Sequence, residues 1–161
     1  MENPLVAIVV LVFIAICLGW AFRQRIATQI KVGFADFASI AKALDETGRD
    51  GSFAAFVFDP KGSDTKDSLN IQFSKEDGVV GFDWVLLCDI NIRDRDKLEA
   101  LALAKGVSLE FRTMNDVDYL RTESEGFAEF PAEILVRLYG CEESQKVTMI
   151  QEGFEWNPDS V

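Results

Sequence analysis

The residues best suited to chemistry are two aspartates, Asp83 and Asp89, in an apolar run in the middle of the chain. Asp83 stands between Phe82 and Trp84, where burial would raise the pKa of its carboxyl group. The alternation of a strand places Asp83 and Asp89 on one face, as a pair of carboxylates for acid–base catalysis requires. The alternative, which we favour, is an aspartate at an edge or facing a loop, whose carboxylate accepts hydrogen bonds from backbone donors.

Composition excludes several other kinds of chemistry. The chain has no histidine, so histidine-based triads and His-ligated zinc sites are impossible. Cys17, Cys88 and Cys141 form no Cys-x-x-Cys pair, and the segment Asp89–Asp94 lacks the third ligand and the glycine of a calcium loop. The 161 residues include 16 Lys and Arg against 27 Asp and Glu, and a net charge of −11 argues against binding to nucleic acid. We therefore expect no enzyme, no metal and no cofactor.

The first part of the chain has the composition of a membrane anchor. No charged residue occurs from Asn3 to Phe22, and these 20 residues would span roughly 30 Å as a helix. A cleaved signal peptide is the alternative, but no basic residue precedes the apolar run and no clear small-x-small cleavage site follows it. We predict a single transmembrane helix over residues 1–25. Its interfacial residues would be Trp20, Phe22, Arg23 and Arg25.

The charges that flank this segment predict its orientation. Arg23, Arg25 and Lys31 follow the apolar run, whereas no Lys or Arg precedes it. The positive-inside rule then places the N-terminus outside the cell membrane and the C-terminal domain in the cytoplasm.

Residues 26–48 have helical periodicity, and we predict a juxtamembrane amphipathic helix there. It either continues from the anchor or is broken at Gly33, with Asp36 capping a second helix. We expect its apolar face to pack on the sheet of the domain, because that face has too few basic residues for a membrane surface. The apolar positions are Ile26, Ile30, Phe34, Phe37, Ile40, Ala41 and Leu44.

Residues 49–161 predict an α+β cytoplasmic domain. Hairpin-linked strands with helices between them favour a mainly antiparallel sheet of five or six strands, and we expect about three helices. Two-sided apolarity makes the strand 79–89 a central one. The predicted strands are 52–59, 69–73, 79–89, 109–111, 117–121 and 147–156, the last with a bulge at Gly153. The predicted helices are 94–105, capped by Asn91 or Asp94, and a second one from Pro131 to Gly140.

From Asp36 to Tyr139 the predicted order is helix, three strands, helix, two strands, helix. This order is similar to the type III secretion chaperone-like fold. The resemblance implies a protein that binds other proteins, often as a dimer, and that is not an enzyme.

These features together predict a single-pass, membrane-anchored, acidic module that binds another protein, basic in charge, as an adaptor, a chaperone-like protein or an immunity-like inhibitor does. A homodimer is compatible with this role. A membrane-tethered enzyme that uses carboxylate chemistry around Asp83 is the alternative. The candidate partner-binding residues are Phe154, Glu155 and Trp156, because large aromatic residues are unusual near a chain end. The alternative is that Phe154 and Trp156 belong to the last strand and are buried in the core.

Overall fold

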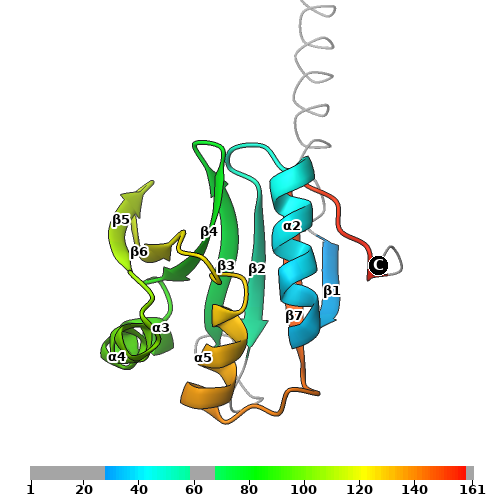
Figure 1. The fold of residues 1–161 in the computed structure, drawn as a ribbon. Coiled ribbons are helices and arrows are strands. Elements are labelled where there is room, and N and C mark those ends of the chain that lie inside the picture. The colour runs from blue at the N-terminus through cyan, green and yellow to red at the C-terminus, as the bar shows by residue number, and fades with distance from the viewer. Residues whose placement is uncertain (1–27, 59–67, 159–161) are drawn as a thin grey trace, which may run out of the picture.

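The domain is a strongly curved antiparallel sheet with its helices on one face (Figure 1). The computed structural model describes residues 28–58 and 68–158. Within them, seven strands pair in the order β1-β7-β2-β3-β4-β6-β5, and each neighbouring pair is antiparallel. The predicted α+β class and antiparallel sheet are confirmed, although the described residues form seven strands and four α-helices rather than five or six and about three.

The strands are β1 (Thr28–Gly33), β2 (Phe53–Phe58), β3 (Leu69–Glu76), β4 (Val79–Val85), β5 (Glu110–Met114), β6 (Val117–Thr122) and β7 (Lys146–Glu152). The helices are the 3-10 turn η1 (Phe34–Asp36), α2 (Phe37–Thr47), α3 (Asp89–Arg93), α4 (Arg95–Lys105) and α5 (Phe130–Tyr139).

The prediction of a helix over 26–48 is wrong for its first part, because residues 28–33 form β1. β1 pairs with β7 from Thr28 opposite Gln151 to Gly33 opposite Lys146. Apolar residues four positions apart share a face in a strand as well as in a helix, so their spacing did not distinguish the two. Residues 28–33 form a strand because they pair with the free edge of β7, which lies more than 100 residues away in sequence.

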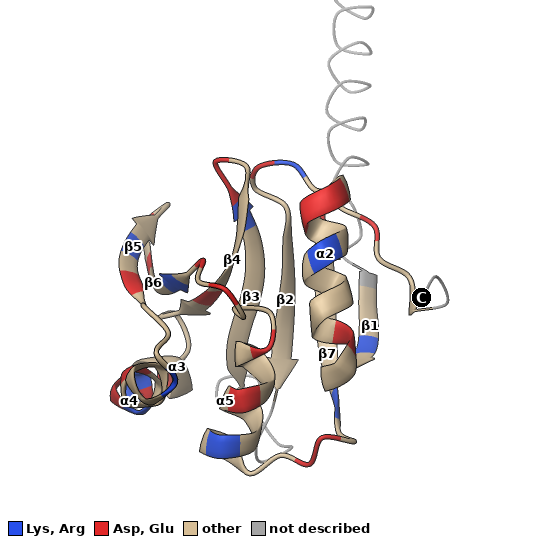
Figure 2. Ribbon diagram, viewed as in Figure 1, with Lys and Arg blue, Asp and Glu red and all other residues tan. Residues whose placement is uncertain are grey.

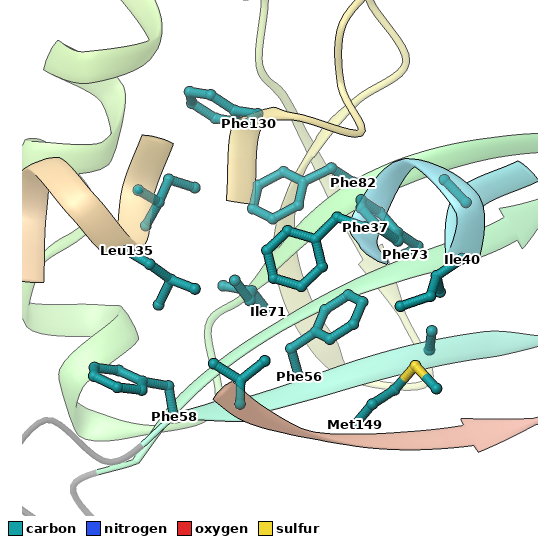
Figure 3. Packing of buried hydrophobic residues seen from close by; sticks show 14 of the residues in the cluster. Phe37, Ile40, Phe56, Phe58, Ile71, Phe73, Phe82, Phe130, Leu135 and Met149 are labelled. Carbon is teal, nitrogen blue, oxygen red and sulfur yellow. The ribbon is translucent and has the colours of Figure 1, made fainter. Parts of the chain in front are cut away.

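The second part of that segment forms α2, whose apolar face packs on the sheet as predicted. Phe37, Ile40 and Leu44 are buried against β2, β3 and β4. The ring of Phe37 lies 4.7 Å from that of Phe56, centroid to centroid, in an edge-on arrangement. Figure 3 shows these rings in the middle of the core, where aromatic and aliphatic side chains of the sheet meet α2 and α5. The periodicity of the helix thus reflects the core of the domain.

β4 lies between β3 and β6, which confirms that this strand is interior. It ends at Val85, four residues earlier than predicted, and Leu87 in the following turn is 64% exposed. Beyond Trp84, α3 takes the place of β4 beside β3. The Asn91 side chain accepts a hydrogen bond from the backbone N–H of Asn70 (3.1 Å) and donates one to its carbonyl oxygen (2.6 Å). The backbone of Asn70 has no partner on β4, and the side-chain amide of Asn91 forms both hydrogen bonds in its place.

The predicted anchor lies outside the described residues. This applies to the segment 1–25, to Trp20, Phe22, Arg23 and Arg25, and to the orientation that their charges predict. Among the residues that the structure describes, none of the helices combines the length and the apolar character needed to cross a bilayer.

Candidate protein-binding surface

Asp83 is a completely buried residue in the middle of the sheet. Its Oδ1 accepts a hydrogen bond from Nη1 of Arg121 at 2.7 Å, and its Oδ2 accepts from Ser74 Oγ and from Gln72 Nε2. Both carboxylate oxygens are therefore occupied by side chains, not by the backbone donors that we expected. Asp89 does not share a strand face with Asp83, because Asp89 is exposed at the first position of α3. The paired carboxylates of the predicted enzyme site are thus not brought together.

Arg121 ties β6 to its neighbours across the face of the sheet that the helices leave open. Its guanidinium also donates to Glu123 (Nε to Oε1, 2.6 Å) and to the carbonyl oxygen of Val79 (3.0 Å). A side chain at Gly81 would meet the guanidinium carbon at 2.7 Å, so only glycine leaves room for Arg121 at this place. We call the whole group the Arg121 cluster: Gln72, Ser74, Glu76, Asp83, Glu110, Arg112, Tyr119, Arg121 and Glu123.

Burial shifts the titration of this cluster. Loss of solvation raises the pKa of Asp83 to about 6, although the Arg121 charge and the hydrogen bonds oppose the shift. Burial and the neighbouring Glu76 raise the pKa of Tyr119 to about 12. A hydrogen bond from Arg121 lowers the pKa of the Glu123 carboxyl group. The cluster is closed and internally satisfied, so its geometry suits the positioning of strands and leaves Asp83 no oxygen that faces a substrate.

The cluster extends to β5 through Arg112. Its guanidinium donates to Glu76 on β3 (Nη1 to Oε2, 3.3 Å) and to Glu123 after β6 (Nη1 to Oε1, 3.1 Å). These bonds hold the β5–β6 hairpin against the rest of the sheet. The hairpin lies at the left of Figure 1. In Figure 2 the hairpin carries both basic and acidic residues. Strand β5 is consequently a well-supported edge.

The outer side of β5 is unpaired among the described strands. The β5–β6 turn contains two residues, Asn115 and Asp116, both with positive φ, so Met114 and Val117 form its closing hydrogen-bonded pair. Hydrogen-bonded pairs alternate along an antiparallel ladder, so the backbone N–H and C=O groups of Phe111 and Thr113 point away from β6. Two residues of the edge thus present free backbone donors and acceptors.

A groove of about 290 Å³ runs between this edge and α4. Leu103 on α4 is 83% exposed and Phe111 on β5 is 51% exposed, although both are large and apolar. The guanidinium of Arg95 stacks on the Phe111 ring, 5.6 Å from its centroid. We call this region the α4–β5 surface; it is lined by Arg95, Glu99, Ala102, Leu103, Val107, Leu109, Phe111 and Leu120.

The aromatic residues that we predicted to bind a partner lie elsewhere. Phe154 and Trp156 are buried, and Trp156 Nε1 donates to Ser39 Oγ on α2 at 3.1 Å, whereas Glu155 between them is exposed. This burial agrees with the alternative that they close the core, and their role in binding stays a prediction. Sequence reasoning did not single out Leu103. A signal existed, because Leu103 lies outside the buried stripe that Leu98 and Ala102 form on α4.

The described residues contain no group of three His, Cys, Asp or Glu side chains that could hold a metal ion. The chain matches no protein-family model, no curated protein and no solved structure.

Proposed function

We propose that this protein is a membrane-tethered, acidic module that binds a basic protein through the α4–β5 surface. The observation that carries the proposal is the pairing of exposed apolar side chains, Leu103 and Phe111, with an unpaired sheet edge. Exposed apolar groups of this size next to a groove are characteristic of protein-binding sites. Such a module would serve as an adaptor, a chaperone-like protein or an immunity-like inhibitor.

The shape of the surface supports binding to a macromolecule better than binding to a small substrate. The groove is shallow, and Leu103 and Phe111 stand at its rim. Aromatic and aliphatic residues in this position act as anchors when a partner removes them from water. Burial of Leu103 contributes about 1.5 to 3 kcal/mol, and burial of Phe111, which is 51% exposed, contributes less than its full value.

The charge of the chain favours a basic partner. The net charge is −11; Glu99 lines the α4–β5 surface together with Arg95, and Glu110 and Asp118 lie on the adjoining hairpin. An acidic surface attracts a basic partner over distance and increases the rate of encounter. Like-charge repulsion also disfavours acidic competitors.

The membrane tether is part of the proposal and rests on the uncharged run from Asn3 to Phe22. The arginines at 23 and 25 support a cytoplasmic location of the binding domain. Tethering restricts the domain to the membrane surface and raises its effective concentration near a partner there.

The test is binding of the full chain, purified in a neutral detergent, to proteins that co-purify with it. Leu103→Ser should abolish stoichiometric capture of a basic protein without changing the melting temperature, because Leu103 is exposed. The matched control is Leu87→Ser, which alters an exposed leucine that does not line the groove. If both variants capture the same protein as the wild type, the α4–β5 surface is not the binding site.

A further inference from the structure

We infer that the partner enters as an extended segment of alternating basic and apolar residues that pairs with β5 as an additional strand. This inference rests on the proposed function and specifies the kind of partner. Addition of a strand to an exposed sheet edge is a known mode of peptide recognition, in which backbone hydrogen bonds provide affinity and side-chain pockets provide specificity.

The backbone of β5 is open to such pairing. The N–H and C=O groups of Phe111 and Thr113 point outward, as the alternation of the hairpin requires. Proteins commonly protect an edge strand with proline, a bulge or a covering element. β5 contains no proline and pairs with β6 without a bulge, so the first two of these protections are absent from it.

The other edge of the sheet, β1, is less suitable. None of its described residues is an exposed large hydrophobic side chain, whereas β5 has Phe111 on the face of the groove and Met114 on the face of Glu110. The α4–β5 groove also adjoins only this edge of the sheet. Apolar contact and free backbone groups therefore coincide at β5.

The two faces of β5 specify opposite side-chain chemistry. Phe111 lies on the face toward α4, so partner side chains on this face would enter the groove beside Leu103 and should be apolar. Glu110 lies on the opposite face together with Arg112 and Met114, is 66% exposed at its side chain and belongs to the Arg121 cluster. That cluster holds four carboxylates, from Glu76, Asp83, Glu110 and Glu123, against the two guanidinium groups of Arg112 and Arg121.

Both guanidinium groups already donate to these carboxylates, which leaves an excess of two negative charges on this face. Lys or Arg side chains of an added strand would complement that excess. A strand exposes alternate residues to opposite faces, so the matching segment alternates apolar and basic residues. A second copy of this chain is a poorer occupant, because it brings the same net charge of −11.

The inference is tested with a synthetic heptapeptide of alternating lysine and valine, blocked at both ends, and the full chain in a neutral detergent. Amide hydrogen exchange should show that the peptide protects the N–H groups of Phe111 and Thr113 at least tenfold. A peptide with glutamate in place of lysine is the charge control and should give no protection.

Two further peptides test the strand geometry. One carries N-methyl groups on its valines and the other on its lysines, so each lacks the backbone donors of one side of the strand. We expect one of them to bind like the parent and the other to bind at least ten times more weakly. Equal affinity of both methylated peptides would overturn one-sided strand pairing.

Thr113→Pro removes an outward N–H from β5, a change that edge strands tolerate. We expect it to weaken peptide binding at least tenfold, and the methylated peptides decide the matter if this variant does not fold. Absence of protection at Phe111 and Thr113, while a protein is still captured through Leu103, would overturn the strand inference and leave the proposed function standing. Protection that appears without peptide as the protein concentration rises would show that a second copy occupies the edge, and would also overturn it.

Discussion

At the scale of single residues, the Asp83–Arg121 pair shows how two charges are accommodated inside the sheet. Both side chains are fully buried, and each has several hydrogen-bonding partners in addition to the other. Loss of solvation makes a buried ion pair costly unless its remaining donors and acceptors are satisfied. The Ser74 and Gln72 bonds to Asp83 meet this requirement. The pair therefore orders the strands and contributes less to net stability than its short distance suggests.

The raised pKa of Asp83 predicts a pH dependence that Asp83→Asn removes. Because its folded-state pKa of about 6 exceeds the usual 3.8, Asp83 contributes stability that is fully present below pH 3.8 and is lost as the pH rises through 6. The stability advantage of the wild type over Asp83→Asn should thus shrink by about 3 kcal/mol between pH 3.5 and pH 7.5. Denaturant unfolding of both proteins at these pH values measures the difference. An advantage that grows with pH would contradict the raised pKa.

Gly81 carries a second prediction at this scale. Gly81→Ala places a methyl group against the Arg121 guanidinium, and overpacking of this kind costs about 1 to 3 kcal/mol. The control is Gly33→Ala in β1, where the added carbon lies at an ordinary 3.6 Å from Asp36. Thermal unfolding should show a lower melting temperature for the first variant only. Equal melting temperatures would mean that Arg121 does not pack over Gly81.

At the scale of elements, α3 substitutes for a length of strand. Asn91 forms two hydrogen bonds with the backbone of Asn70, and its carbonyl oxygen accepts from Trp84 Nε1 at 2.9 Å. The five-residue helix thereby connects the start of β3 to the end of β4. This connection directs the chain into α4, which forms one wall of the α4–β5 surface.

Asn91→Ala should destabilise the protein by about 1 to 3 kcal/mol, because it leaves two partly buried backbone groups of Asn70 without their side-chain partner. Amide exchange at Asn70 should accelerate at the same time. Ile92→Ala is the matched control in the same helix, since Ile92 is 55% exposed and its removal should change stability little. Similar stability losses in the two variants would contradict the role of the Asn91 side chain.

At the scale of the whole molecule, the two ends of the described chain lie beside each other. β1 pairs with β7, and the segment after β7 returns across α2, where Phe154 and Trp156 join the core. Closure of the fold therefore depends on residues more than 100 positions apart. This arrangement makes the C-terminal segment a structural element of the domain.

Deletion of residues 154–161 should lower the free energy of unfolding by several kcal/mol, as the loss of buried aromatic side chains does. Glu155→Ala, which changes the exposed residue between them, should leave it nearly unchanged. Denaturant unfolding of the two variants measures both effects. If the shortened protein keeps its stability but no longer binds its partner, Phe154 and Trp156 form the docking site and are not required for the core.

The proposed topology is tested by a reporter fused after Val161. A reporter that functions only in the cytoplasm should be active, because Arg23, Arg25 and Lys31 follow the uncharged segment and no basic residue precedes it. A reporter that is active only outside the cytoplasm would overturn both the orientation and the choice of partner.

Local patterns of residues were enough to predict the fold class, most element positions and the acidic charge of the domain. Alternation identified β3, and the helical spacing from Phe37 to Leu44 identified the buried face of α2, because side-chain period is a local property of the backbone. Asp77-Gly78 and Asn115-Asp116 form two-residue turns with positive φ, a local conformation that these residue types favour.

Tertiary structure alone decided which residues the elements bring together. Residues 28–33 form a strand because β7 has an edge free to pair with them. Of the two candidate helix caps, Asn91 pairs with Asn70 instead, and Asp94 is the N-cap residue of α4 without a side-chain capping bond. Asp83 accepts a hydrogen bond from Arg121, 38 positions away in sequence, whereas backbone donors or a pairing with Asp89 were the expectations. Leu103 and Phe111 were placed at one surface by the packing of α4 beside the β5–β6 hairpin. These outcomes depend on contacts between distant segments, whose energies no local pattern of residues encodes.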